Sequence, residues 1–478
     1  MKPLIATVLL VAGGFPFAFL LTRRWLLAGL LAPLVAAVTA SLAVIGMLVT
    51  EGSLRVWLVA ALAAQWVLVA WRLRRPRSPL PYGTWADVLC YVLPLGLPAL
   101  MVLAPPVQWD AHSIWWTHAA YFVQGGEFAR QDMSAFAYHF SHPDYPPLTS
   151  AAVAGAWTVL PGFNFGVAQV VSTVLNLSAI GTLAYAVRSV TGRAPVALSR
   201  LAAVAVALAA WGTAPYAVAG GYSDQLWAAA VVGAAALLLL GDRPMARPAI
   251  PVLLLTVAAL SKNEALAPVL AVALLVTLRE RRNLRSVWPV WPPVLAGAGW
   301  MLFARALGAN SDITTHTGVS GLLTGGKGVY DRFPPTLNSL WSAVDILILT
   351  AAAVALLGWA ALRRRREALG IGSDLWLWSL AVIYAVSLVF VYVTSTGVGL
   401  AWYLMTSIDR VTVPIEMLAS LSAVCWAVSA VAGGRDPDVG RDQPVDADLA
   451  SDLPGPRRRL TVKISSAKRS RSTSVARS

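Results

Sequence analysis

The chain has 478 residues, of which 58% are hydrophobic and only 13% are charged, and its mean hydropathy is +0.66. Soluble proteins carry about a quarter charged residues, so this composition excludes a soluble globular protein. The net charge of +14 does not indicate a nucleic-acid partner, because the basic residues form short clusters between apolar segments. That arrangement is typical of membrane proteins, which keep Lys and Arg on the cytoplasmic side.

Apolar segments that are long enough to cross a bilayer recur along the chain, which predicts an all-α polytopic membrane protein with about thirteen transmembrane helices. We expect the first helix to be retained, because Arg23 and Arg24 follow its apolar run, whereas a cleaved signal peptide carries its charge before that run. The expected spans are residues 3–21, 25–49, 56–71, 84–104, 166–187, 201–217, 225–240, 249–260, 265–278, 288–306, 341–362, 374–394 and 411–432, and residues 149–160 could form a further short or interfacial helix.

All the basic clusters fall on one side of the membrane when these spans are threaded through it. We therefore expect that side to be cytoplasmic, with residues 1–432 as the transmembrane domain and residues 433–478 as a disordered basic tail. The clusters are Arg23 with Arg24, RLRRPR at 72–77, Arg188 with Arg193 and Arg200, Arg243 with Arg247, RERRNLR at 279–285, RRRR at 363–366 and the tail.

The opposite, outer side receives a large loop, residues 105–165, after the fourth span, and four shorter segments, 220–225, 261–265, 307–340 and 394–410. A protein that only scaffolds the membrane does not need its polar chemistry collected on one face. The outer side holds all five histidines, His112, His118, His139, His142 and His316, together with Asp110, Asp144, Asp224, Glu264, Lys262, Lys327 and Arg410.

The large outer loop begins with WDAHSIWW, which brings Asp110 to the membrane edge directly after the fourth span. A helix is expected to continue through this segment, with Asp110, Thr117 and Tyr121 on one face. A carboxylate under aromatic cover can act as the general base that deprotonates an acceptor hydroxyl, or can hold a divalent cation. The alternative is a solvated helix cap, since Asp is a favoured N-cap residue.

The same loop ends in HFSHPDYPPLTS, in which two prolines predict an extended segment and a turn into the next helix. His139, His142 and Asp144 could reach one metal ion or one substrate phosphate, since two histidines and a carboxylate match a metal-binding set in type. Their spacing matches no known ligand motif, so the alternative is a rigid polar loop with hydrogen-bonded histidines.

Two motifs place charges at short turns between spans. In GYSDQLW, Asp224 stands where one span ends and another begins, and the alternative to a functional role is a cap for the helix that starts at Gln225. In SKNEALAP, Lys262 and Glu264 lie between two short spans, so we expect both charges at membrane depth, where ionisable residues are functional candidates. The alternative for this motif is a structural Lys–Glu pair.

Arg410 lies in WYLMTSIDRV, where the last outer segment ends and the final span begins. A guanidinium at this level can hold a phosphate. The alternatives are interfacial snorkelling or an ion pair with Asp409. Cys90 and Cys425 both lie in apolar spans, so we expect neither a disulfide framework nor a cysteine metal site.

The chain therefore carries WDAHSIW after an early span, HPDYPPL near the end of the first large outer loop, then GYSD, SKNEA, and finally SIDR before a late span. In order and sidedness these motifs resemble the GT-C class of integral-membrane glycosyltransferases, which includes protein mannosyltransferases and the aminoarabinose transferase of lipid A. The resemblance covers residues 85–410. The Ala, Val and Arg content is also typical of an actinobacterium.

The resemblance implies an inverting hexosyl- or pentosyltransferase that uses a polyprenyl-phosphate sugar on the outer face of the cytoplasmic membrane. The acceptor would be the hydroxyl of an envelope glycan, lipid or protein. It also implies an essential Asp in the first outer loop, which matches Asp110, and in many members a nearby divalent cation. This chain has a single Asp where some members carry an adjacent acidic pair, which leaves the cation open.

Each candidate residue has an expected role in that reaction. Arg410 would hold the donor phosphate, helped by Lys262 or Lys327, and Trp115 and Trp116 would stack on sugar rings. An Mg²⁺ or Mn²⁺ ion, if one is used, would lie at Asp110, His142 and Asp144. The residues expected to position the acceptor or substrate are His142, Asp144, Tyr145, Asp224 and Glu264.

Two rival functions come from other classes. A transporter or flippase of lipid-linked sugars would favour internal repeats and broken helices at the midplane, and the sequence shows no convincing repeat. A non-enzymatic scaffold for envelope assembly would tolerate substitution of Asp110. Membrane lipids are expected contacts in every case.

Overall fold

The computed structural model of the protein describes residues 1–73, 78–105, 108–241, 248–309, 326–362, 371–395 and 399–432. Within these ranges every regular element is a helix, which confirms the all-α prediction. Nine helices or helix runs in the described ranges are long and apolar enough to cross a membrane, so the count of thirteen stays a prediction. They are Lys2–Thr22, Trp25–Thr50, Leu54–Leu73, Trp85–Leu103, Phe165–Val190, Leu284–Ala306, Gly328–Leu362, Ser373–Thr394 and Leu400–Ala432.

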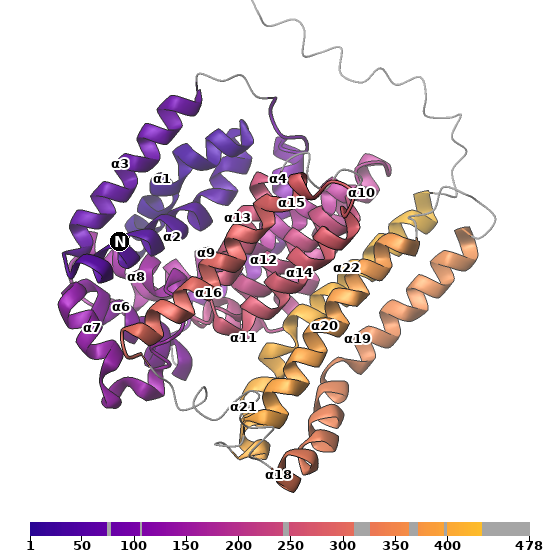
Figure 1. Ribbon diagram of the computed structural model, residues 1–478. Coiled ribbons are helices and arrows are strands. Elements are labelled where there is room, and N and C mark those ends of the chain that lie inside the picture. The colour runs from indigo at the N-terminus through magenta and orange to yellow at the C-terminus, as the bar shows by residue number, and fades with distance from the viewer. Residues whose placement is uncertain are drawn as a thin grey trace, which may run out of the picture. The chain divides into compact units, whose positions relative to one another are not determined.

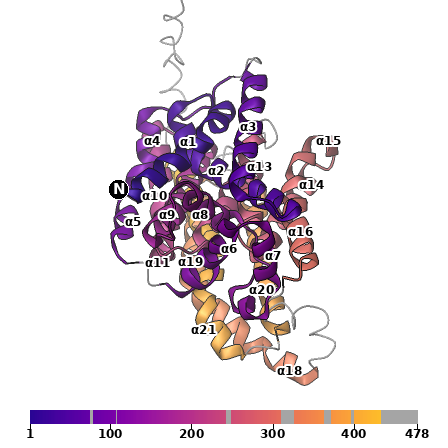
Figure 2. The ribbon, with the colours of Figure 1, turned by 90° about the vertical axis from the view of Figure 1, so that its left-hand side faces the viewer.

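The first three helices, α1 (Lys2–Thr22), α2 (Trp25–Thr50) and α3 (Leu54–Leu73), pack on one another (Figures 1 and 2). Gly14 allows the closest approach, because a side chain there would collide with the backbone of α2 at Ala32. Gln65 of α3 joins all three helices, since it donates to the Gly13 carbonyl at 2.8 Å and accepts from Thr39 at 2.9 Å. Such interhelical hydrogen bonds stabilise packing where water is absent.

The fourth predicted span is broken into four short helices, α4 (Trp85–Val92), η1 (Leu93–Leu95), α5 (Gly96–Leu100) and η2 (Met101–Leu103). Pro94 and Pro98 cause the breaks, because proline lacks the N–H that continues a helix. The segment predicted to be the large outer loop then folds into five more helices, η3 (Ala111–Trp116), α6 (Thr117–Gln124), α7 (Gly126–Ser134), η4 (Phe136–Ser141) and α8 (Leu148–Val159).

Helix α9 (Phe165–Val190) is the central element, since it contacts α1, α2, α8, α10 and α12. Asn164 caps it by accepting a hydrogen bond from the Val167 N–H at 3.0 Å. Helix α10 (Val196–Gly212) differs from the predicted span 201–217, because Pro195 starts it early and Pro215 forces a break before the short α11 (Pro215–Ala219).

The middle of the chain forms a buried core beside α9. Helix α12 (Asp224–Ala235) is buried at every residue, and its Ala and Gly side chains let α9 and α13 approach closely. The other helices here are η5 (Ala236–Leu240), α13 (Ala249–Ala259), η6 (Asn263–Ala265), α14 (Leu266–Arg279), α15 (Leu284–Val287), η7 (Trp288–Val290) and α16 (Trp291–Ala306).

The last helices are α18 (Gly326–Asp331), α19 (Phe333–Leu362), α20 (Ile371–Thr394), α21 (Leu400–Val411) and α22 (Val413–Ala432). Figure 1 shows α19, α20 and α22 side by side, and α22 also packs on α10 and α12. The helical run is interrupted at Thr412, between α21 and α22, just before Pro414. Each of the thirteen predicted spans therefore lies on a helix or a run of helices. The predicted tail, residues 433–478, lies outside the described residues.

Candidate functional site

Asp110 precedes a π-helix, η3, which carries the rest of the WDAHSIWW segment. The Thr117 hydroxyl donates to the His112 carbonyl, five residues back, at 2.7 Å. The wider turn of a π-helix changes the spacing of side chains from that expected for a regular α-helix. The Asp110 side chain makes no capping hydrogen bond. It forms an ion pair and a hydrogen bond with Arg410, 300 positions along the chain.

Arg410 stands at the end of α21 and connects two carboxylates. Besides Asp110, it lies 3.8 Å from Asp224 through its Nη1 atom. Its Nη2 atom donates to the Thr406 carbonyl at 3.1 Å, and its guanidinium lies 5.0 Å from the centre of the Tyr222 ring. The side chains of Arg410 and Asp110 are 15% and 21% exposed, so this pair is partly accessible.

Asp224 is the buried centre of the cluster. It is the first residue of α12 rather than its cap, which is Ser223, so the capping alternative does not describe it. Its Oδ1 atom accepts a hydrogen bond from Lys262 at 3.0 Å, and its side chain is only 1% exposed. Because a buried carboxylate is costly without partners, the two cations on either side are what keep Asp224 charged.

Lys262 and Glu264 occupy the break between α13 and α14. Lys262 lies 3.3 Å from Glu264, so the predicted Lys–Glu pair is present. Lys262 also forms an ion pair with Asp224. Burial alone would lower the pKa of Lys262, but the charges of Asp224 and Glu264 raise it above its ordinary value. Lys262 is therefore a fixed cation in the protein interior.

Tyr145 extends the network to the HPDYPPL motif. Its hydroxyl donates to Glu264 at 2.9 Å, and Lys262 lies 5.8 Å from the centre of its ring. Burial and the nearby Glu264 charge hold the pKa of Tyr145 well above its ordinary value, so the hydroxyl stays a donor. The result is an unbroken chain of contacts that runs from Asp110 through Arg410, Asp224, Lys262 and Glu264 to Tyr145.

Asp144 and His142 flank this chain. Asp144 accepts from Asn263 at 2.8 Å through its carboxylate, and from the Trp300 indole at 2.9 Å through its backbone carbonyl. His142 adopts a left-handed backbone conformation and stacks on Tyr145, with ring centres 5.1 Å apart. Both residues therefore position the Pro-Pro segment against the SKNEA turn.

The depth of the cluster follows from its attachment to α9. Asn176 donates to the carbonyls of Val218 and Tyr222 at 3.0 Å each, and this fixes the turn that precedes Asp224. Asn176 lies about 16 Å along α9 from Phe165, because a helix rises about 1.5 Å per residue. The cluster therefore lies well along from the Phe165 end of a helix that is long enough to span a membrane.

The two tryptophans predicted to stack on sugar rings are buried. Trp115 stacks on Tyr145 with ring centres 5.6 Å apart, and Trp116 stacks on Phe165 at 5.6 Å; each is 1% exposed. Neither ring is open to a sugar in this conformation. Both shape the site by packing, whereas Trp109, in the same segment, is 74% exposed.

The predicted metal set is not assembled. Among the described residues no group of three or more His, Cys, Asp or Glu side chains is arranged to hold a metal ion. Asp110 is occupied by Arg410, while His142 and Asp144 lie beside Tyr145 and Asn263. The divalent cation stays a prediction.

Tyr222 and Asn263 belong to the site but were missed as individual residues. Tyr222 stacks under Arg410 and reaches Gln108 at 3.4 Å, and Asn263 binds Asp144. Both lie inside motifs that the sequence singled out, so any polar or aromatic neighbour in those motifs was a candidate. His316 and the side chain of Lys327 lie outside the described residues.

His118 gives the site region a built-in pH dependence. Its ring is fully buried, and Nε2 lies 2.8 Å from the Ser141 carbonyl, so Nε2 carries the proton and donates. Burial lowers the pKa of His118 to about 3, from an ordinary value of 6.5. As the pH falls below 6.5, His118 becomes protonated in the unfolded chain but stays neutral in the folded protein. The free energy of unfolding therefore decreases.

We therefore expect the free energy of unfolding to decrease by about 1 kcal/mol per pH unit between pH 6.5 and pH 5 on account of His118 alone, because the unfolded imidazole is only half protonated at pH 6.5. His118→Gln, which keeps a donor for Ser141, should flatten the pH profile by that amount. Unfolding in detergent at several pH values measures both slopes. Equal slopes in the two proteins would contradict the assignment.

Comparisons with protein-family models, with curated proteins and with solved structures returned no match. Function is therefore inferred from the geometry and chemistry of these residues, and the likeness to GT-C enzymes stays a prediction.

Proposed function

We propose that the protein is a membrane glycosyltransferase of the GT-C type. It would move a sugar from a polyprenyl-phosphate donor to an acceptor hydroxyl on the outer face of the cytoplasmic membrane, in the synthesis of an envelope glycan, glycolipid or glycoprotein. The observation that supports this proposal is the charged network from Asp110 to Glu264, which four separate segments build inside an otherwise apolar helical protein.

The network has the components that transfer from a lipid phosphate requires. A lipid-linked donor carries a phosphate that needs a cationic partner, and Arg410 is partly accessible. Three carboxylates face two cations, so the network carries one unit of excess negative charge. An arriving phosphate would therefore have to displace a carboxylate, and Asp110 is the most exposed partner of Arg410.

This displacement would couple donor binding to activation of the base. Arg410 would exchange Asp110 for the phosphate, which frees Asp110 to accept a proton. The acceptor oxygen would attack the anomeric carbon while its proton passes to Asp110. The bond from that carbon to the phosphate oxygen breaks, and the phosphate leaves with the electron pair, stabilised by Arg410. Attack opposite the leaving group inverts the anomeric centre.

One feature favours transport of a lipid-linked sugar as a second candidate. Broken helices carry the central charges, since Lys262 and Glu264 lie in the break between α13 and α14, and Asp224 follows the break after α11. Transporters use such breaks to bind substrates within the membrane. A transporter would move the substrate without cleaving the sugar–phosphate bond.

The experiment that separates the candidates follows bond cleavage. Purified protein in nanodiscs is incubated with labelled polyprenyl-phosphate sugars and acceptor extracts, with and without Mg²⁺ or Mn²⁺, and release of polyprenyl phosphate is measured. Release supports transfer. Movement of intact donor across a proteoliposome membrane, without release, would support transport and contradict the enzyme.

Arg410 is expected to determine donor affinity. Arg410→Gln should raise the KM for the donor about 10- to 100-fold, because one charge-assisted hydrogen bond to phosphate contributes about 1.5–3 kcal/mol. Arg410→Lys keeps the charge but not the two-pronged geometry and should fall between that variant and the wild type. An unchanged KM in a folded Arg410→Gln protein would place the phosphate elsewhere.

A further inference from the structure

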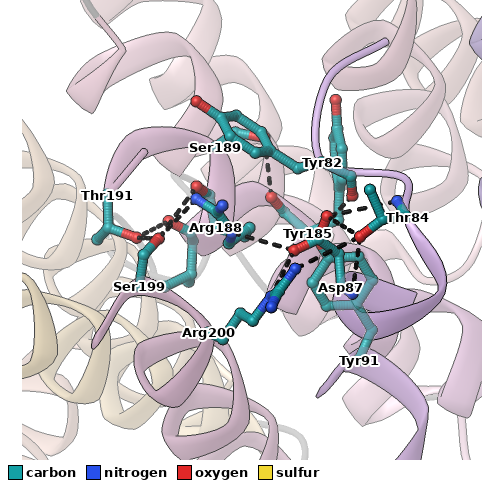
Figure 3. Close-up of polar contacts among 11 residues, drawn as sticks. Tyr82, Thr84, Asp87, Tyr91, Tyr185, Arg188, Ser189, Thr191, Ser199 and Arg200 are labelled. Atoms are coloured by element: carbon teal, nitrogen blue, oxygen red, sulfur yellow. Dashed lines mark hydrogen bonds and ion pairs between the residues drawn. The ribbon is translucent and has the colours of Figure 1, made fainter. Parts of the chain in front are cut away.

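A second polar cluster lies near the C-terminal end of α9 (Figure 3). Its centre is Asp87, in the first turn of α4, which accepts from the Thr84 hydroxyl at 2.6 Å. Two guanidinium groups bind the other oxygen of Asp87. Arg188, near the end of α9, lies at 3.4 Å, and Arg200, near the start of α10, lies at 2.9 Å.

The two arginines differ in the exposure of their side chains and in the number of contacts that they make with the protein. The Arg188 side chain is 5% exposed, and it is also bound by Ser199 at 2.9 Å and stacked 4.2 Å from the centre of the Tyr82 ring. The Arg200 side chain is 30% exposed, and among the described residues its contacts beyond Asp87 are limited to a long one of 3.5 Å to Thr84. Within the described part of the chain, Asp87 is the one carboxylate paired with these two cations, so this cluster carries an excess positive charge that is accessible at Arg200.

Arg24 adds a third cation to the same region of the chain. It comes from the turn between α1 and α2, and its Nε atom donates to the Leu80 carbonyl at 3.2 Å. Its aliphatic part packs against Gly83, where a side chain would lie 3.0 Å from the Arg24 Cγ atom. The segment from Leu80 to Thr84 is therefore bordered by Arg24 on one side and by Arg200 on the other.

The helices that carry the cluster expose apolar side chains. Trp85, Leu89 and Leu93, which follow one stripe of α4 and η1, are 71%, 47% and 70% exposed. On α10, which packs against α4, Val196 and Leu201 are 53% and 63% exposed. In a membrane such side chains contact acyl chains, and an exposed Trp beside them is typical of the headgroup boundary.

We propose that Arg200 binds the phosphate of an anionic phospholipid in the inner leaflet, with the acyl chains along the exposed apolar side chains of α4 and α10. Arg23, Arg24, Arg188, Arg193 and Arg200 belong to the side that the distribution of basic residues predicts to be cytoplasmic. That leaflet carries the anionic lipids, and basic pockets between helices on that side bind their headgroups. The site does not depend on the proposed transferase activity, because its residues are separate from the charged network, which is attached to α9 at Asn176, whereas this site uses Arg188 near the end of that helix.

The test uses the full chain in detergent and counts bound lipid by native mass spectrometry, with phosphatidylglycerol as the anionic probe and phosphatidylcholine as the neutral one. Arg200→Gln should weaken phosphatidylglycerol binding about fivefold, as expected for one arginine at an anionic surface, and leave phosphatidylcholine binding unchanged. The protein should still fold, because Asp87 keeps Arg188 and Thr84. The matched control is Arg282→Gln, an exposed arginine of the 279–285 loop, which should bind phosphatidylglycerol like the wild type.

Two further measurements keep the proposal falsifiable. Phosphatidylglycerol should raise the Tm of the wild-type protein more than phosphatidylcholine does, because a ligand that binds only the folded state stabilises it. Glycerol phosphate, which lacks acyl chains, should not displace the lipid. The proposal is overturned if Arg200→Gln and the wild type retain phosphatidylglycerol equally, if the two lipids raise the Tm equally, or if glycerol phosphate competes as well as the lipid.

Discussion

Replacing Asp110 by Asn is expected to reduce the rate of sugar transfer by about 10²- to 10⁴-fold, the usual loss when a general base is removed. The amide has nearly the shape of the carboxylate, and it can still accept a hydrogen bond from Arg410. What it lacks is the ability to take the proton from the acceptor hydroxyl. Release of polyprenyl phosphate under single-turnover conditions measures the effect directly.

The ion pair between Asp110 and Arg410 makes this prediction more specific. In the wild type the donor phosphate must compete with the Asp110 carboxylate for the guanidinium. Asp110→Asn removes that competitor, so the KM for the donor should fall or stay unchanged while kcat collapses. A variant that had only lost its structure would show the opposite pattern, a higher KM or no folded protein.

Asp409→Asn is the matched control, because Asp409 is an exposed carboxylate next to Arg410 on the same helix. It should leave both kinetic constants close to those of the wild type. Full release of polyprenyl phosphate by Asp110→Asn would retain the enzyme but move the base elsewhere, with Glu264 and Asp144 as the remaining candidates. Loss of activity in both variants would show that the negative charge around Arg410 matters rather than the proton acceptor.

The positions of the helices could be predicted because hydropathy is a local property of the sequence. Long apolar runs have to form helices in a membrane, where each backbone group needs a partner within its own segment. Errors arose where proline acts locally, as in the shift of α10 and the breaks within residues 85–103. The outer-side charges could be selected as a group because charge is rare in this chain.

The partners of those charges could not be predicted, since they depend on tertiary packing. Asp110 and Arg410 are 300 positions apart, and the pair forms only because α21 comes to lie beside η3. The π-helix could not be predicted either, because it changes the spacing of the WDAHSIWW side chains around the helix and leaves the hydropathy of the segment unchanged. The burial of Trp116 also follows from packing, against Phe165 of α9. Asp87 could have been found, because a carboxylate at the start of an apolar span calls for a partner.

Asp224→Asn is expected to lower the free energy of unfolding by about 3 kcal/mol, near the lower end of the range for breaking a buried ion pair. A loss near the lower end of that range is expected because each of the two cations keeps a second carboxylate partner. Lys262 keeps Glu264 at 3.3 Å, and Arg410 keeps Asp110. Reversible denaturation in bicelles measures the loss, and Asp409→Asn, an exposed charge, should change stability by less than about 0.5 kcal/mol.

The double variant Asp224→Asn/Lys262→Met decides whether the loss comes from charge. If the loss comes from the buried charge of Lys262, removing both charges should restore part of the stability, since a neutral pair carries no desolvation cost. The recovery is only partial because Lys262→Met also leaves Glu264 without its cation. If the double variant is as unstable as the sum of the single variants, Asp224 contributes through packing at the start of α12 instead. Restored stability without restored transfer would mean that these charges are retained for the reaction, because the fold does not need them.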